Sequence, residues 1–247
     1  MSSSKHYIAI LKWKRAEHSA LKDLKDNDKK HITPLVELVL PTVSTHKDKN
    51  RKVKKTEEEM LAEMVLKFKE KRVKEIPEEI LKFWGSKTVF VDVSLLHNGQ
   101  STVKLKIESL NKIISVGVEL DLGLIPVINL NDDAEIKAAV CLLCKKYKQG
   151  LCLRIGPSDL LHIEELNEKI SNFLLSLEVK ENEVDLLVDI KEIKEKGGQY
   201  LQFSNLSQQI SNLDKWRSFI FASGAFPVDL SECKVDEPNL LARFDWQ

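Results

Sequence analysis

Residues 124–147 read LIPVINLNDDAEIKAAVCLLCKKY, and this stretch contains the repeating unit from which we predict the whole fold. Its first seven residues form a nearly continuous apolar run, which is too short for a stable helix and does not alternate polar with apolar residues. Such a run is typical of a strand buried on both faces, as in a parallel sheet. Asn131 and Asp132 follow and can cap a helix, so we predict a helix over 133–147.

The same succession of a short apolar run and a longer charged segment recurs along the chain. Strands that alternate with helices predict βαβ units and a parallel sheet. The predicted strands cover residues 7–13, 32–40, 88–95, 124–130, 151–155, 184–190 and 218–222. The predicted helices cover residues 16–24, 57–83, 102–120, 133–147, 158–177 and 203–213, with Thr56 as a capping candidate for the second.

These seven strands with the helices between them, about seven units, predict an α/β protein and, within that class, a TIM-like (β/α) barrel rather than a doubly wound sheet. No glycine-rich phosphate turn follows the first predicted strand, which argues against a dinucleotide-binding fold. A full barrel has eight strands, whereas residues 228–247 show no further strand–helix pair. We therefore expect a single barrel-like domain over residues 1–247 that lacks its eighth strand.

The charge balance and the hydropathy of the chain exclude several classes of protein. Lys plus Arg and Asp plus Glu both number 38, so the chain has no excess of positive charge with which to bind nucleic acid. No apolar stretch approaches the roughly 18–20 residues that a membrane span needs. The first residues, MSSSKHYIAI, do not resemble a secretory signal. These features predict a cytoplasmic protein.

Cysteine and histidine give no sign of a metal centre. The cysteines lie in or beside apolar runs, which is typical of buried thiols in a reducing compartment; they are Cys141, Cys144, Cys152 and Cys233. Cys141 and Cys144 lie in a predicted helix without a second pair, so we interpret them as packing residues. The six histidines lack any metal-ligand spacing, and no cofactor can be named from the sequence.

A basic run, HKDKNRKVKK at residues 46–55, interrupts the second strand–helix unit and defines an excursion over about residues 44–56. Such runs are typical of solvated segments. An alternative follows from its place after a strand, where the active-site loops of barrels lie. There it would form a basic lid over an anionic ligand.

Polar side chains near the carboxyl ends of the strands are the candidate site, because a barrel gathers these ends at one mouth. The predicted catalytic residues are Lys12, Glu37, Asp92 and Asp189, of which the three carboxylates can act as acids, bases or ligands of a divalent cation. The predicted ligand-binding residues are Lys14, Asn129, Arg154 and Ser223. The alternative is an internal ion-pair network without catalysis.

Several segments of the chain resemble the phage "beta protein" family. They are YIAILKWKRAEHSALKDL at 7–24, ITPLVEL at 32–38, GSKTVFVDVS at 85–94, FIFASGAFP at 219–227 and ARFDW at 242–246. The resemblance implies a barrel-like protein carried by bacteriophages, satellite phages or bacteria, and a role in conflict between them. Members typically continue past the segment matched by Arg243, Asp245 and Trp246, which implies a shorter chain here.

Two functions from different classes remain open on the sequence. The first, which the resemblance favours, is a phage–host conflict protein, acting in antiphage defence or neutralising a toxin, that binds a protein partner from the same phage or defence locus. The second is an enzyme or receptor for an anionic, nucleotide-like small molecule at the mouth of the barrel, which would use the strand-end cations. A membrane partner is not expected, and nucleic acid is the least favoured partner.

Overall fold

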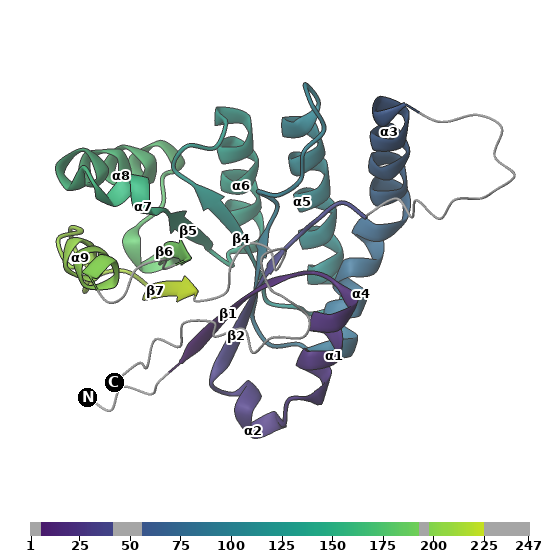
Figure 1. Cartoon of the computed structure of the whole chain (residues 1–247), viewed down its shortest axis with the longest axis horizontal. Helices are drawn as coiled ribbons and strands as arrows, with labels where there is room; N and C mark the ends of the chain where they lie inside the picture. The colour runs from purple at the N-terminus through teal and green to yellow at the C-terminus, as the bar shows by residue number, and fades with distance from the viewer. Residues whose placement is uncertain (1–5, 42–55, 193–197, 225–247) are drawn as a thin grey trace, which may run out of the picture. The chain divides into compact units, whose positions relative to one another are not determined.

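The computed structural model describes residues 6–41, 56–192 and 198–224 of the chain (Figure 1). The chain divides into two compact units. Unit 1 comprises Met1–Ile128 and Asp132–Leu151, and unit 2 comprises Asn129–Asn131 and Cys152–Gln247. The basic run at 46–55, Cys233 and the segment that contains Arg243 lie outside the described residues. The prediction that residues 1–247 form one domain stays a prediction.

Unit 1 contains the first four strands and the helices that follow them. Its strands are β1 (Tyr7–Lys12), β2 (Ile32–Glu37), β3 (Val89–Asp92) and β4 (Leu124–Asn129), of which the last residue is counted with unit 2. Its helices are α1 (Arg15–Asp23), α2 (Asp26–Lys29), α3 (Glu57–Lys67), the π-helical turn η1 (Phe68–Arg72), α4 (Val73–Phe83), α5 (Thr102–Glu119) and α6 (Ala134–Tyr147). Helix α5 packs between α4 and α6.

Unit 2 contains the remaining strands and shorter helices. Its strands are β5 (Leu151–Ile155), which begins at the last residue of unit 1, β6 (Val184–Glu192) and β7 (Ser218–Gly224). Its helices are α7 (Pro157–Leu160), α8 (Ile163–Leu177), the 3-10 turn η2 (Glu181–Glu183) and α9 (Gly198–Ser207). Helix α7 contacts α8, α9 and β6 within this unit.

The predicted α/β class and the (β/α) barrel type are confirmed. Seven strands in the described residues follow one another in sequence order, β1 to β4 in unit 1 and β5 to β7 in unit 2, with helices between successive strands. Every strand pair whose register is described is parallel. All four residues of β3 and all five of β5 are buried, as expected for strands covered on both faces. The residues after Gly224, where an eighth strand would follow, lie outside the described part.

The predicted helix over 57–83 is one continuous helical segment that contains an irregular turn. Thr56 caps it as predicted: its Oγ1 accepts a hydrogen bond from the Glu59 N–H at 3.2 Å, and the Thr56 N–H donates to Glu59 Oε2 at 2.9 Å. This reciprocal pair is a capping box. The π-helical turn Phe68–Arg72 was not expected, and its first and last residues line the nearby site.

Two predicted helices differ from the structure. The segment 158–177 is divided into α7 and α8 around His162, and Asp159 Oδ2 accepts a hydrogen bond from the Gly156 N–H at 2.8 Å to cap α7. The prediction of a helix over 203–213 is wrong at both ends, since α9 covers Gly198–Ser207. Residues 208–215 form turns, in which Asn212 has a positive φ of 59° that a helix cannot contain. Ile210 in this segment is buried, and its position in the sequence has the spacing of an apolar helix face, which led to the wrong prediction.

The part of the chain that the structure describes has no helix that is long and apolar enough to cross a membrane. Of the cysteines predicted to pack in a helix, Cys144 is buried in α6, and its Sγ lies 3.2 Å from the Gly150 carbonyl oxygen. Among the described residues, no group of three or more His, Cys, Asp or Glu side chains is arranged to hold a metal ion.

Helix α5 lies against β4 at Gly117, and this close approach yields a test of the fold. A side-chain carbon at position 117 would lie 2.9 Å from Cγ of the buried Leu124 and closer still to its Cδ1. We expect Gly117→Ala to lower the free energy of unfolding by about 1–3 kcal/mol, because overpacking outweighs the helix propensity of alanine. Urea denaturation measures the change. Asn111→Ala, at an exposed position of the same helix, is the control, and a Gly117→Ala protein as stable as that control would contradict the packing.

Candidate functional site

Three of the predicted site residues lie side by side at the ends of the first three strands. Lys12 is the register partner of Glu37, and Glu37 is the register partner of Asp92. Register partners in a parallel sheet project from the same face, so the three side chains share one face of unit 1. Lys12 is exposed, Glu37 is half-buried and Asp92 is buried. The sequence predicted that these strand ends lie together; their shared register is a finding of the structure, and the catalytic roles stay predictions.

Asp92 also organises the backbone that follows β3. Its Oδ1 accepts a hydrogen bond from the Ser94 N–H at 2.7 Å, which is the geometry of an Asx turn. The Leu38 N–H donates to the Asp92 carbonyl oxygen at 2.8 Å and so extends the pairing of the two strands beyond β2. Asp92 thus has a structural role in ending β3, whatever chemistry it performs.

A pocket of about 270 Å³ lies beyond the ends of β1 and β2 in unit 1. It combines three cationic side chains with aromatic and aliphatic walls. Its lining residues are Trp13, Lys14 and Arg15 after β1, Leu38, Val39, Leu40 and Pro41 after β2, and Phe68, Arg72 and Ile76 from the helical segment. Of the predicted ligand-binding residues, Lys14 lines this pocket. The mouth end of the strands is where barrel sites lie.

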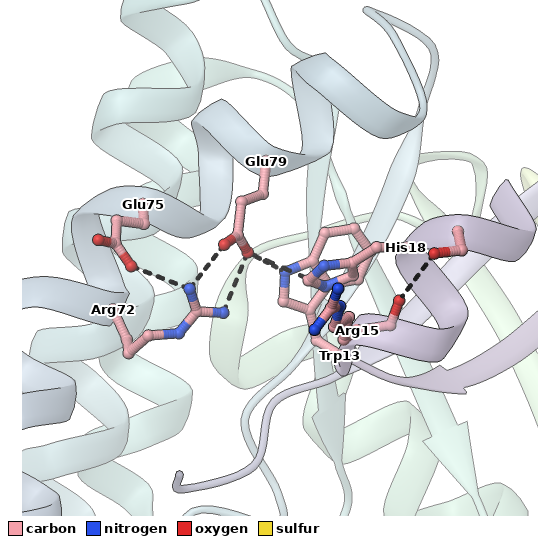
Figure 2. Close-up of polar contacts among 7 residues, drawn as sticks. Trp13, Arg15, His18, Arg72, Glu75 and Glu79 are labelled. Carbon is pink, nitrogen blue, oxygen red and sulfur yellow. Dashed lines mark hydrogen bonds and ion pairs between the residues drawn. The ribbon is translucent and has the colours of Figure 1, made fainter. Parts of the chain in front are cut away.

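Arg72 forms the helical wall of the pocket, and two carboxylates hold its guanidinium (Figure 2). Its Nη1 donates to Glu75 Oε2 at 2.9 Å and to Glu79 Oε1 at 2.6 Å, and its Nη2 donates to Glu79 Oε2 at 3.0 Å. The two bonds to Glu79 are bidentate, the geometry that fixes an arginine most firmly. The hydrogen bonds with Glu79 raise the pKa of Arg72 above its ordinary value, so the cation is permanent.

A π-helical turn ends at Arg72, in this wall of the pocket. Arg72 is the last residue of the turn Phe68–Arg72, and both of these residues line the pocket. A π turn adds a residue to a helical turn and rotates the side chains that follow it, and such turns are frequent at functional sites. Phe68, Arg72 and Ile76 follow one another at intervals of four residues, the spacing of neighbours on one helix face, and all three line the pocket.

Glu79 joins the helical wall to the end of β1. Its Oε2 accepts a hydrogen bond from the Trp13 Nε1–H at 2.9 Å, in addition to those from Arg72 (Figure 2). Burial raises the pKa of the Glu79 carboxyl, but the hydrogen bonds from Arg72 and Trp13 and the charge of Arg72 outweigh this effect. The pKa therefore lies below its ordinary value, and Glu79 is ionised at neutral pH.

His18 on α1 completes this cluster as an aromatic ring. It lies between Trp13, with ring centroids 4.2 Å apart, and Phe83, with ring centroids 5.0 Å apart. Burial is the largest influence on His18 and lowers its pKa; Glu79 and Glu17 raise it and the charge of Arg72 lowers it, and the pKa lies below its ordinary value. Its Nε2 is 3.9 Å from Glu79 Oε2, beyond a hydrogen bond. A neutral, stacked imidazole packs α1 against α4.

In unit 2 the structure pairs two of the predicted residues directly. Arg154 on β5 donates to Asp189 Oδ2 on β6 from Nε at 3.0 Å and from Nη2 at 2.5 Å, and both side chains are 5% exposed. Lys191 adds its backbone N–H to Asp189 Oδ1 at 2.9 Å and its Nζ to Oδ2 at 2.6 Å. Burial raises the pKa of Asp189, but the charges of Arg154 and Lys191 and their hydrogen bonds lower it below its ordinary value.

The two remaining predicted residues also lie near strand ends. Asn129 is the last residue of β4 and is half-buried. Ser223 lies on β7, where Phe221, two residues earlier on the same face, contacts Tyr200 of α9 with ring centroids 5.5 Å apart. Ser223 therefore faces the helical layer, whereas Ala222, the register partner of Asp189, shares the face of Asp189. The Oγ of Ser223 is buried and has no hydrogen-bond partner among the described residues.

Five residues of these clusters were not predicted from the sequence. Arg72, Glu75 and Glu79 have helical spacing, so a search for charged residues on one face of the 57–83 helix could have found Arg72 and Glu79. His18 looked like one of six scattered histidines, because only packing brings it to Trp13. Lys191 follows Asp189 by two residues, and only the local backbone of β6 brings both its N–H and its Nζ to that carboxylate.

Removal of the Glu79 charge tests the cluster and has a definite pH dependence. The pKa of Glu79 is lowered from 4.5 in the folded chain, so its contribution is complete above pH 4.5 and is lost as the pH falls through the lowered pKa. We expect Glu79→Gln to lower the free energy of unfolding by about 1–3 kcal/mol at pH 7 and the deficit to shrink below pH 4.5. Urea denaturation at a series of pH values measures this. Glu78→Gln, at an exposed neighbour, is the control, and a deficit that does not vary with pH would contradict the account.

Comparison with known proteins places the chain in a family. No curated protein matches the chain. The sequence model described as "Beta protein" matches residues 7–247, which is nearly the whole chain and includes both units and every strand described above. This match confirms the family that the motifs at the strand ends resembled, and it suggests a phage-associated protein. The chain belongs to the beta protein family.

Proposed function

We propose that this chain binds a phosphate-bearing, nucleotide-like small molecule in the pocket at the ends of β1 and β2. The observation that carries the proposal is the composition of the pocket wall, which combines the cations Lys14, Arg15 and Arg72 with the aromatic rings of Trp13 and Phe68. Cations provide charge-assisted hydrogen bonds to an anion, and aromatic and apolar surface accommodates the body of the ligand.

The balance of charge around the pocket favours an anion. Arg72 is partly neutralised by Glu75 and Glu79, which it contacts through both terminal nitrogens. Lys14 and Arg15 are exposed, and among the described residues neither forms an ion pair with a carboxylate. Three cations thus accompany two carboxylates. The exposed pair supplies the surplus charge, while the tethered Arg72 supplies a fixed geometry.

The size of the pocket limits the ligand. Its volume of about 270 Å³ is near the lower end of the range for small-molecule sites, roughly 300–1,000 Å³. A mononucleotide or a sugar phosphate fits this size better than a dinucleotide. Lys12, Glu37 and Asp92 on the adjoining strand ends do not line this pocket, so the proposal assigns them no contact with its ligand.

A role in phage–host conflict is the setting that we propose for this binding. Family membership suggests a phage-associated protein, and a nucleotide-like signal can couple binding to the engagement of a protein partner from the same phage or defence locus. Ligand binding and partner binding are compatible in this proposal. Co-purification of the chain with each protein encoded beside it, with and without nucleotides, tests the second part. If none of these proteins binds under either condition, the partner hypothesis is wrong.

Charge removal at the pocket tests the ligand-binding proposal. We expect thermal denaturation with a panel of mononucleotides and sugar phosphates to show a raised Tm for at least one of them, since a ligand at about 100 times its Kd adds about 2.7 kcal/mol. The double variant Lys14→Ala/Arg15→Ala is expected to weaken that ligand's binding by about tenfold to a hundredfold, because two charge-assisted contacts are lost.

The control is Lys22→Ala, which removes an exposed cation from the same helix α1 away from the pocket lining. It is expected to keep the affinity of the unaltered chain. A double variant that folds and binds the ligand as tightly as this control would contradict the proposal. A panel in which every compound leaves the Tm unchanged would contradict it too.

A further inference from the structure

Strand β6 contains a bulge at Lys191. The register pairs Asp189 with Ala222 and Glu192 with Gly224, so two residues of β6 lie opposite the single residue Ser223 of β7. One of these two, Lys191, has a positive φ of 59°. A non-glycine residue pays a steric penalty in this left-handed region. Bulges that redirect a side chain are common at the rims of barrels and beside active sites.

The effect of the bulge is to bring Lys191 back onto Asp189. Its N–H and its Nζ both reach the carboxylate of a residue only two positions earlier, at 2.9 Å and 2.6 Å. The Lys191 side chain remains 56% exposed, while that of Asp189 is only 5% exposed. The lysine therefore extends from a buried carboxylate toward solvent, and its ammonium is accessible.

Asp189 does not depend on this ammonium for its charge balance. Arg154 donates to Asp189 from two nitrogens in the buried part of the cluster, and the backbone N–H of Lys191 donates a further hydrogen bond. A buried carboxylate that lost its only cation would be strongly destabilised, but Asp189 would keep Arg154. An ion pair with one largely exposed member is weak, so the ammonium can leave without unfolding the site.

We propose that Lys191 is an anion-contacting residue of unit 2, held on Asp189 when no ligand is bound and transferred to a phosphate or carboxylate group of a ligand. The bulge fixes the backbone of Lys191 at the rim, Arg154 keeps Asp189 compensated, and the flexible side chain moves between the two anions. Lys191 is not among the residues that line the pocket of unit 1, and the inference does not rest on the function proposed for that pocket.

The competing explanation is that Lys191 only stabilises the bulge, and a residue-specific measurement distinguishes the two. The full chain is treated with acetic anhydride with and without inorganic pyrophosphate, and the acetylation rate of each lysine is measured by mass spectrometry. Pyrophosphate is expected to slow acetylation of Lys191 by about tenfold, as for a site largely occupied by the anion. Lys180, which is exposed and precedes the opposite end of β6, is expected to react at an unchanged rate.

Variants at position 191 separate the ammonium from the backbone. Calorimetric titration with pyrophosphate is expected to show about tenfold weaker binding for both Lys191→Ala and Lys191→Gly, and unchanged binding for Lys180→Ala. Glycine accepts a positive φ without strain, so Lys191→Gly preserves the bulge. Equal Lys191 acetylation with and without pyrophosphate would overturn the proposal. So would undiminished binding by Lys191→Ala, or binding that Lys191→Gly restores.

Discussion

The described site in unit 1 depends on the hydrogen bonds that the Glu79 carboxylate accepts. This carboxylate accepts hydrogen bonds from Arg72 and from Trp13, and thereby connects the helical segment after β2 to the end of β1. Trp13 and Arg72 both line one pocket, Trp13 from the end of β1 and Arg72 from the helical segment. One half-buried anion thus fixes both walls. The low pKa of Glu79 follows from this arrangement, because the hydrogen bonds from Arg72 and Trp13 stabilise the ionised carboxylate more than the protonated one.

The polar strand ends of the two units have different character. In unit 2, Arg154 and Asp189 form a buried, bidentate pair, and such a pair costs so much desolvation that it is weak evidence for stability by itself. In unit 1, Lys12, Glu37 and Asp92 follow one another across three strands from exposed to buried. A graded arrangement of this kind leaves a cation at the surface, where a ligand can reach it. Polar residues at strand ends thus form a buried ion pair, Arg154 and Asp189, in unit 2, and leave the cation Lys12 exposed in unit 1.

Much of this fold could be predicted from the sequence, because strands buried on both faces appear as continuous apolar runs. The run LCLRI predicted β5 with its observed bounds, and the ends of the apolar runs predicted that Lys12, Glu37 and Asp92 lie near the carboxyl ends of their strands. Thr56 was recognisable as a cap because capping depends on neighbours in the sequence. The residues of the candidate site that lie at strand ends could therefore be predicted.

What could not be predicted depends on local backbone irregularity and on tertiary packing. The π turn before Val73 adds a residue to a helix, and the bulge at Lys191 adds a residue to a strand. The residue types at these positions do not predict either irregularity. His18 becomes part of the site only because α1 packs against α4. The helix expected over 203–213 failed because buried Ile210 lies in a turn. Spacing in the sequence cannot distinguish this packing from a helical face.

The most direct measurement is a double-mutant cycle between Arg72 and Glu79 on the free energy of unfolding, with the variants Arg72→Met, Glu79→Gln and the two combined. If the bidentate pair holds the pocket wall, the two changes are strongly non-additive, with a coupling energy of about 1–3 kcal/mol at pH 7. Additive changes, within about 0.5 kcal/mol of the sum of the single variants, would contradict the central role assigned to Glu79.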